Sequence, residues 1–429
     1  MGRKFLSFLG TTKYVPAYYR LNNQRVGPVT FVQEALVQII CKNWEKGDKI
    51  CIFCTKDAQD KNWEDKNKSK EANFKKGLYS RLLSLNLRPN IEKIDIPEGK
   101  SEKEILAIFE TVFNTLEKND VITFDITHSF RSLPMLNLVV LNYAKFLKNI
   151  EIEGIYYGAF EVLGEPKDVE KNIPLEKRNA LIFDLTPYAK LLEWSFAVSD
   201  FIKYGQTQRL KELIEEKTKP VLAKTKGKNK TAQSLKLLAE RLNRLANNIL
   251  CNRGYEIIKQ GNFNKLIDSI QESELIPPFK PLLEKIKAKT KDFQTDNIKN
   301  GFIAAKWCYE HGLIPQGITI LEETIISLFC EKYGLDMRNK DDRNLISGCL
   351  NAKNKPKKEW KDILKTREVE AEKIVNTMSE DICKFFKDLA NTRNDINHGG
   401  FNKDARKYHK FTQALNRFLQ NINKLLWLD

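Results

Sequence analysis

The strongest candidates for chemistry are Arg393, Asn394 and His398, which lie near the end of an expected helix. Gly399 and Gly400 follow them and are strong helix stops. Arg393 and His398 lie about 140° apart on an ideal helix, so they converge only where the helix end frays. An arginine can hold a phosphate with its fork of donors, and a histidine can transfer protons near pH 7. RNA cleavage needs these two functions, because the 2′-hydroxyl of RNA supplies the nucleophile.

The same pattern also has a purely structural interpretation. A histidine at a helix C-terminus is favoured by the helix dipole, and an arginine can simply lie on the exposed face. However, the chain has only four histidines, at positions 128, 311, 398 and 409, and one of them ends this polar run. No cluster of Asp, Glu and His has metal-nuclease spacing, which favours metal-free chemistry. We expect His311 to cap a helix and His409, in the basic run 406–410, to lie at the surface, where it could face RNA.

Two polar loops in the first part of the chain form a second group of candidate site residues. The first loop follows an expected strand and contains Gly10, Thr11, Thr12, Lys13 and Tyr14. The second follows another strand, opens a helix, and contains Thr127, His128, Ser129, Phe130 and Arg131. In an open parallel sheet, ligands bind where such loops diverge at the carboxyl ends of the strands, and free N–H groups at a helix start favour phosphate. Turn, cap and salt-bridge roles are the alternative, but two such loops in one sheet favour a phosphate-bearing or nucleotide ligand.

Short β-type runs alternate with helical patterns in this part of the chain, which is typical of a mostly parallel sheet covered by helices. The expected strands are 4–9, 49–55, 91–96, 121–125, 152–157 and 181–183. Thr30 with Gln33, and Ser101 with Glu104, have the spacing of capping boxes that open helices. We expect 57–70 to be a solvated loop. The helix 133–147 is apolar nearly all round, which predicts burial between layers or a dimer interface.

The β-type runs stop after about Pro187, and the rest of the chain is expected to be helical. We expect an apolar helix over 189–204, and further helices near 232–248, 299–311, 315–333, 372–397 and 404–426. The lysine-rich stretch 217–230 contains Pro220 and Gly227, so it is interpreted as a mobile loop or, less simply, as a basic RNA-contacting arm. The sequence therefore predicts three parts, which are a sheet domain over 1–188, a helical connector over 189–298 and a helical domain over 299–429.

Composition limits the possible partners. The 429 residues carry 72 Lys and Arg against 56 Asp and Glu, giving a formal charge of +16. This favours a polyanionic partner, although a lysine-rich surface can also serve solubility. No apolar run approaches the roughly 20 residues of a membrane span, and no signal peptide is recognisable, so we expect a cytoplasmic protein without membrane contact. Cys51 and Cys54 form a C-x-x-C inside a strand and are expected to be buried thiols rather than zinc ligands or a redox pair.

Taken together, these motifs resemble the CARF–HEPN ribonucleases of type III CRISPR systems. The resemblance is carried by 9–14, 125–134 and 156–161 in the sheet part, then by 307–313 and by the run from Arg393 to His398. It covers most of the chain, although the stretch 205–298 contributes little. The implied fold is an N-terminal Rossmann-like CARF domain followed by a helical HEPN domain.

The resemblance implies a single-stranded RNA endonuclease that stays idle until cyclic tetra- or hexa-adenylate binds the CARF domains of a homodimer. The HEPN arginine and histidine correspond to Arg393 and His398, with Asn394 as the following polar residue. Arg393 would bind phosphate, His398 would transfer a proton and Asn394 would orient both, in a site shared by two protomers and without metal. The implied product carries a 2′,3′-cyclic phosphate. The implied ligand-binding positions are Gly10, Thr11, Thr12, Tyr14, Thr127, His128, Ser129, Phe130 and Arg131.

Two alternatives remain open at this point. The chain could act chiefly as a ring nuclease that degrades cyclic oligoadenylate, because some relatives slowly cut their activator in this pocket. It could also be a non-enzymatic regulator that senses the ring and binds nucleic acid or a partner through its helical half. Ring size and RNA sequence preference are not determined by the sequence.

Overall fold

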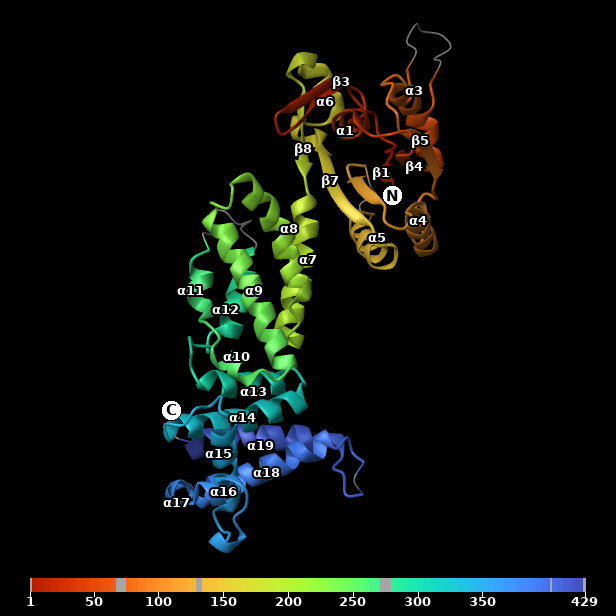
Figure 1. The fold of residues 1–429 in the computed structure, drawn as a ribbon. Coiled ribbons are helices and arrows are strands. Elements are labelled where there is room, and N and C mark those ends of the chain that lie inside the picture. Colours follow the sequence, from red (N-terminus) through yellow and green to blue (C-terminus); the bar gives the residue numbers. More distant parts are fainter. Residues whose placement is uncertain (1, 67–74, 129–132, 271–278, 402, 427–429) are drawn as a thin grey trace. The chain divides into compact units, whose positions relative to one another are not determined.

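The computed structural model describes residues 2–66, 75–128, 133–270, 279–401 and 403–426. The chain divides into two compact units, Met1–Lys190 and Leu191–Asp429. The first unit is a sheet with helices on both faces, and the elements described in the second are all helices (Figure 1). The predicted fold class, α/β followed by all-α, is confirmed.

One eight-stranded sheet organises the first unit. Its strands are β1 (Arg3–Phe8), β2 (Ala17–Leu21), β3 (Gln24–Val29), β4 (Lys49–Cys54), β5 (Asn90–Asp95), β6 (Val121–Asp125), β7 (Glu151–Ala159) and β8 (Asn179–Asp184). Their order across the sheet is β3-β2-β8-β7-β6-β1-β4-β5. The run from β5 to β7 is parallel, whereas β8 is antiparallel to β7. The run from β5 to β8 therefore has the strand order of a Rossmann fold.

The hairpin formed by β2 and β3 was not predicted from the sequence. It leaves β1 in the middle of the sheet and pairs with β8 at the far edge, where β2 runs parallel to β8. Asn22 adopts a positive φ of 52° in the turn between the two strands. The two adjacent asparagines, Asn22 and Asn23, between short runs containing Tyr and Val were the signal available for it in the sequence.

Helices cover both faces of this sheet and bury two separate cores. On one face α1 (Val32–Ile40) and α3 (Leu78–Leu83) pack over β1, β2 and β4. On the other face α4 (Glu102–Thr115) and α5 (Leu133–Lys148) pack over β1, β4 and β6. The short helix α6 (Pro166–Asn172) precedes β8. Alternate side chains of the central strands β1 and β4 enter opposite cores, as the period-two geometry of a strand requires.

One of the two expected capping boxes has the predicted N-cap residue. The N-cap of the other lies one residue later than predicted. Ser101 Oγ accepts the N–H of Glu104 at 3.2 Å, as predicted for the start of α4. At α1 the N-cap is Phe31, and the carboxylate of Glu34 accepts the N–H groups of Thr30 and Phe31, each at 2.9 Å. Thr30 is therefore not the N-cap residue. The side chain of Gln33, which would complete a capping box with Thr30, is directed into the sheet instead.

The stretch expected to be a solvated loop after β4 is partly helical. The short helix α2 (Lys56–Ala58) continues as one π-helical turn, η1 (Gln59–Trp63). Asn62 and Trp63 in that turn are buried. The abundance of lysine hid this turn, because two buried side chains among exposed ones give no periodic signal.

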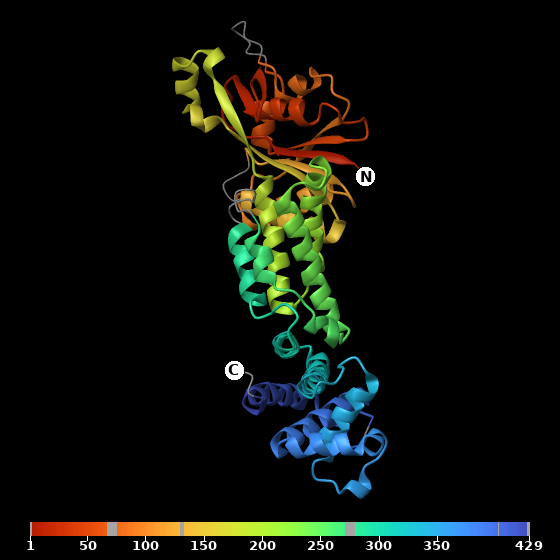
Figure 2. The same ribbon diagram turned by 60° about the vertical axis from the view of Figure 1, so that its left-hand side comes forward.

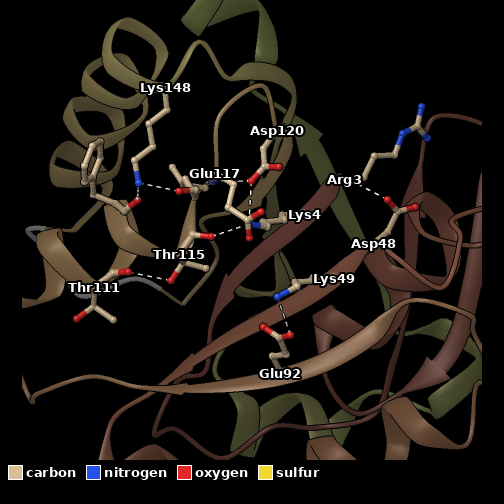
Figure 3. A network of polar contacts seen from close by, with 12 residues as sticks. Arg3, Lys4, Asp48, Lys49, Glu92, Thr111, Thr115, Glu117, Asp120 and Lys148 are labelled. Carbon is tan, nitrogen blue, oxygen red and sulfur yellow. Dashed lines mark hydrogen bonds and ion pairs between the residues drawn. The ribbon is translucent and has the colours of Figure 1, made fainter. Parts of the chain in front are cut away.

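A buried ion network fixes the amino end of the sheet (Figure 3). Lys4 in β1 is 3% exposed, and its Nζ lies 2.8 Å from Glu117 Oε1, from Asp120 Oδ2 and from the carbonyl of Thr115. Burial opposes the charge, yet the two carboxylates raise the pKa of Lys4. Lys148, at the end of α5, donates to the carbonyls of Phe113 and Leu116, each at 2.7 Å. These two lysines tie β1, α4 and α5 together.

The second unit consists of helices around one continuous core. Its helices are α8 (Gln208–Lys224), α9 (Lys230–Leu250), α10 (Gly254–Ile258), α11 (Phe263–Asp268), α12 (Lys280–Thr290), α13 (Lys299–Glu310), α14 (Ile314–Lys332), α15 (Lys340–Ala352), α16 (Ile363–Thr366), α17 (Glu368–Thr377), α18 (Glu380–Asn397) and α19 (Tyr408–Leu426), while α7 (Thr186–Tyr204) crosses the boundary between the units. Helices α8 and α9 pack side by side (Figure 2), as do α13 and α14. The division into three parts remains a prediction.

Two expectations about helices need correction. The stretch 217–230 is not a loop throughout, because α8 continues through Pro220 to Lys224 and α9 begins at Lys230. The buried face of α8, which includes Leu210, Ile214 and Thr218, explains why tertiary packing overrides the proline.

Helix α5 is also not buried on all sides. Val140, Leu141 and Ala144 are buried, whereas Val139, Tyr143, Phe146 and Leu147 are exposed. The interpretation that this face lines a dimer interface stays a prediction.

Candidate functional site

The two predicted polar loops leave neighbouring strands at the same edge of the sheet. Strands β1 and β6 are parallel and in register, with Ser7 opposite Asp125. The strand order reverses between them, because β4 lies on one side of β1 and β6 on the other. This is the topological switch point at which open α/β sheets bind ligands. The prediction that the loops lie close together therefore agrees with the topology.

Asp125 is the buried centre of this site. Its Oδ2 accepts the hydroxyl of Ser7 at 2.7 Å, and its Oδ1 accepts the hydroxyl and the N–H of Thr127 at 2.5 and 3.0 Å. Burial raises the pKa of the Asp125 carboxyl, and these hydrogen bonds oppose that shift. The hydroxyl of Thr127 also accepts the N–H of Gly158 at 2.8 Å. Thr127 is thus locked in one rotamer by partners on β6 and β7.

Close packing of Gly158 against α1 supports this arrangement. A Cβ added at Gly158 would lie 2.4 Å from Cγ2 of Val32, so only glycine fits between β7 and α1. Gln33 of α1 also reaches β1, where it donates to Ser7 Oγ and to the carbonyl of Phe8, each at 3.1 Å. Sequence reasoning missed Ser7 and Gln33, because nothing in their local pattern distinguishes them from ordinary core-facing polar residues.

Tyr14 and His128 bring the two loops into contact. Their rings meet edge to face with centroids 4.7 Å apart, and Tyr14 also packs on Phe31 at 4.6 Å. The hydroxyl of Tyr14 accepts the N–H of Gly10 at 2.9 Å, and burial raises the pKa of Tyr14 well above its usual value. Burial lowers the pKa of His128 to about 4, so its imidazole is neutral at pH 7. A neutral imidazole can offer one donor and one acceptor to a ligand.

Gly10 is packed closely by side chains of both loops. A Cβ added there would lie 2.9 Å from the Tyr14 hydroxyl and 3.2 Å from the His128 ring. Asn62 of η1 fixes the same loop by donating to the carbonyls of Gly10 and Thr12 at 2.9 and 3.0 Å. Asn62 was not predicted as part of the site, since it lies within the stretch expected to be a loop.

The structure describes some of the remaining predicted ligand-binding residues and not others. Thr11 and Thr12 are exposed, so their hydroxyls are accessible to a ligand. Lys13 is exposed as well and pairs with Glu170 of α6. Ser129, Phe130 and Arg131 lie outside the residues that the structure describes.

In the second unit, Arg393 of α18 is held by a buried carboxylate that sequence reasoning missed. Glu322 of α14 is 3% exposed, and its Oε1 accepts Nη2 of Arg393 at 3.1 Å. Nε of Arg393 lies 3.0 Å from Oε2 of the same carboxylate, although this second contact is not aligned as a hydrogen bond. Burial raises the pKa of Glu322, and the charge of Arg393 opposes that rise. The arginine side chain is 31% exposed, so its outer edge remains open to solvent.

His398 occupies the helix end, as predicted, but does not meet Arg393 within one chain. It is the C-cap residue of α18, and its N–H bonds to the carbonyl of Asn394 at 3.0 Å. The side chains of Asn394 and His398 are exposed. Within the described part of the chain, no hydrogen bond or ion pair joins Arg393 to either of them. Gly399 and Gly400, with φ of 63° and 77°, then turn the chain away.

A pocket of about 550 Å³ adjoins this helix end. Gly399 and Gly400 line one part of it, and Arg406 and Tyr408 line another. Arg406 ties the following turn to α18, because its Nη1 donates to Thr392 Oγ1 at 2.9 Å and its N–H donates to Asp395 at 3.2 Å. The exposed end of α18 therefore combines an oriented guanidinium, an accessible imidazole and a neighbouring hollow.

Other residues considered from the sequence have structural positions. Cys51 and Cys54 are both fully buried, but they belong to the cores on opposite faces of the sheet, and burial raises the pKa of each to about 12. They are buried strand thiols, as expected. His311 is the C-cap of α13, also as expected, and packs on Trp307 with ring centroids 4.6 Å apart.

The sheet order, the switch-point loops and the helical second unit define a Rossmann-like domain followed by a helical domain. Residues 4–161 match the family model described as CRISPR system endoribonuclease Csx1, CARF domain. Residues 190–297 match the model described as CRISPR-associated protein MJ1674, second domain. A curated relative, CRISPR-associated protein MJ1674 of Methanocaldococcus jannaschii, is 27% identical over 245 residues, or 57% of this chain and 34% of that protein.

The chain thus carries a CARF domain and is similar to CRISPR-associated proteins, which confirms the CARF part of the resemblance. It spans about a third of the length of the curated relative that it matches. Neither family match extends beyond residue 297, so the HEPN assignment of 299–429 stays a prediction. Among the described residues, no helix has the length and apolar character needed to span a bilayer.

Proposed function

We propose that the chain is an RNA endonuclease that becomes active when a cyclic oligoadenylate binds its CARF domain. The observation that carries the proposal is Arg393, oriented by the buried Glu322 and followed by the exposed His398 at the same helix end. A CARF domain in the same chain supplies the ligand-sensing half. The name of the matching family, which includes the word endoribonuclease, supports a nuclease role in general.

The chemistry follows from the residues at the end of α18. Arg393 binds a non-bridging phosphate oxygen and neutralises the charge that develops in the transition state. His398 moves a proton at the reacting oxygens, and Asn394 orients Arg393 and His398. The RNA 2′-hydroxyl attacks its own phosphate and the 5′-oxygen leaves with a proton, which gives a 2′,3′-cyclic phosphate. Because one chain offers a single Arg–His pair whose members do not touch, two protomers related by a two-fold axis would supply the composite site.

The two loops at the switch point are proposed to hold the activator, with cyclic tetra-adenylate and cyclic hexa-adenylate as the two candidates. Thr11 and Thr12 present exposed hydroxyls beside Gly10, whose missing side chain leaves room for Tyr14 and His128. The neutral His128 and the fixed Thr127 supply polar groups from the second loop. A two-fold symmetric ring suits a pocket built by two CARF domains.

The test is cleavage of a fluorescent single-stranded RNA in EDTA, with and without each ring, beside a His398→Ala control. Cleavage that requires one ring and is lost in His398→Ala supports the proposal and identifies the activator. Ring binding without RNA cleavage by the wild-type chain contradicts it. Breakdown of the ring under those conditions would indicate a ring nuclease, and its persistence a non-enzymatic regulator.

A further inference from the structure

The turn after α18 presents two aromatic rings to solvent. Phe401 is 97% exposed and Tyr408 is 85% exposed. We call Phe401 together with residues 403–410, the last three of which begin α19, the basic-aromatic turn. Single exposed aromatic residues are common on protein surfaces, but here two lie within eight positions and neither is needed for the core. Their exposure leaves both rings available for a contact outside the chain.

The same turn carries unpaired positive charge. Lys403, Arg406, Lys407 and Lys410 outnumber Asp404 by 4 − 1, a net +3. Arg406 is used internally, since it binds Thr392 and Asp395 of α18. The other three side chains are exposed, and none of them forms an ion pair in the portion of the chain described. Three lysines are therefore available to a polyanion.

The turn lies directly beside the proposed catalytic residues. The N–H of Phe401 bonds to the carbonyl of His398 at 3.3 Å. Tyr408 and Arg406 line the same pocket as Gly399 and Gly400. Because Arg406 anchors the turn to α18, the aromatic rings are held near the helix end rather than on a free arm.

We infer that the basic-aromatic turn is the subsite that grips single-stranded RNA on one side of the cleaved phosphate, and this inference rests on the proposed function. Phe401 and Tyr408 stack on unpaired bases, while Lys407 and Lys410 contact phosphates. Alternating rings and cations are the chemistry by which proteins hold single strands without reading sequence. A second copy of the chain fits less well, because a two-fold contact would bring two +3 segments together.

The first experiment measures binding of a short fluorescein-labelled 2′-O-methyl oligoribonucleotide by anisotropy. This probe cannot be cut, since its nucleophilic hydroxyl is blocked, so binding is measured separately from cleavage. Phe401→Ala and Tyr408→Ala should each weaken binding about 5- to 100-fold, the range expected for loss of one stacked base. Phe401→Trp should keep wild-type affinity, whereas Phe401→Leu should bind as weakly as Phe401→Ala, because leucine keeps apolar area without a ring. Tyr204→Ala, which removes a ring 61% exposed on α7, is the matched control and should change nothing.

Salt dependence distinguishes the two kinds of contact. Lys407→Ala and Lys410→Ala should each reduce the slope of log affinity against log salt concentration by about 0.7, one phosphate contact, while the aromatic variants leave the slope unchanged. Wild-type affinity of both aromatic variants overturns the inference. Loss of the dimer in either variant, measured by analytical ultracentrifugation, overturns it in favour of a contact between copies. If the wild-type chain binds the probe through this turn but never cuts unmodified RNA, the subsite stands and the proposed function fails.

Discussion

Glu322 is the residue whose role the structure adds to the proposed nuclease site. It contacts Arg393 rather than RNA, so it is a positioning residue. Glu322→Gln keeps the shape of the side chain but removes the charge that orients the guanidinium. We expect kcat for RNA cleavage to fall about 10- to 100-fold, the cost of misplacing a reacting group by about an ångström, with KM changed little.

Glu323→Gln provides the matched control for that measurement. Glu323 is the next residue on α14, and it pairs with Arg343 instead of Arg393. This variant should retain wild-type kcat. Equal losses in the two variants would contradict a specific role of Glu322, and unfolding measurements on both will show whether either change merely destabilises the helical unit.

His128 should make the stability of the chain depend on pH. Its pKa falls from 6.5 to about 4 on folding, so the unfolded state binds more protons between these values. The stabilisation is therefore fully present above pH 6.5 and is lost as the pH falls toward 4. His128→Gln should flatten the curve of unfolding free energy against pH by at most about 3 kcal/mol over that range. Denaturant titrations at a series of pH values will measure it, and parallel curves for the two proteins would show that His128 is not buried as neutral imidazole.

At the residue scale, the sequence indicated the reactive groups but not the residues that hold them. Arg393 and His398 were predicted from residue type and from the helix stop that follows. Glu322 was missed because it lies 71 positions earlier. The signal available was a carboxylate within an otherwise apolar helical pattern, which often means a buried partner.

At the element scale, one close contact between helices is open to a direct test. A Cβ added at Gly301 of α13 would lie 2.1 Å from Oγ1 of Thr324 on α14, so the two helices must separate to admit it. Gly301→Ala should lower the unfolding free energy by about 1–3 kcal/mol through overpacking, although alanine favours helix.

Gly254→Ala is the control, because a Cβ there meets nothing within 4 Å at the start of α10. It should leave stability unchanged or slightly raised. Unfolding by urea, followed by circular dichroism, will compare the two variants. A neutral Gly301→Ala would mean that α13 and α14 can shift apart without cost.

The strands and helices that sequence reasoning found are those with a strong periodic pattern. The central strands and the N-cap of α4 belong to this group. The hairpin of β2 and β3 was missed because its pairing with β8 joins residues more than 150 positions apart, such as Tyr18 and Asn179. Local propensity carries no information about such a partner. Residues 217–224 of α8 were expected to be a loop for a related reason, since the buried face of the helix outweighs Pro220.

At the scale of the whole molecule, the proposed function predicts that variants of the ligand site and variants of the nuclease site lose different properties. Thr127→Val removes the hydroxyl that joins Asp125 to Gly158, so it should raise the activator concentration for half-maximal RNA cleavage about 10-fold. The maximal rate at saturating activator should stay within about twofold, because the helix end of α18 is untouched.

His398→Ala should show the converse behaviour. Titration calorimetry should give a wild-type dissociation constant for the ring, while cleavage is lost. A variant pair that failed to separate in this way, for example if His398→Ala abolished ring binding, would contradict a sensor and a nuclease site on different units.

The connection between β1 and β2 has a consequence for chain length. It crosses the carboxyl ends of β6 and β7 and the amino end of β8, a span of about 19 Å at the usual strand spacing. Fully extended, the residues from Leu9 to Pro16 reach about 30 Å, and Asn62 draws the first of them back beside β4. The segment therefore has only a little more length than it needs to reach from β1 to β2. Natural or engineered variants should tolerate changes of residue type here more readily than deletions, since removing two or three residues would pull the hairpin off the edge of the sheet.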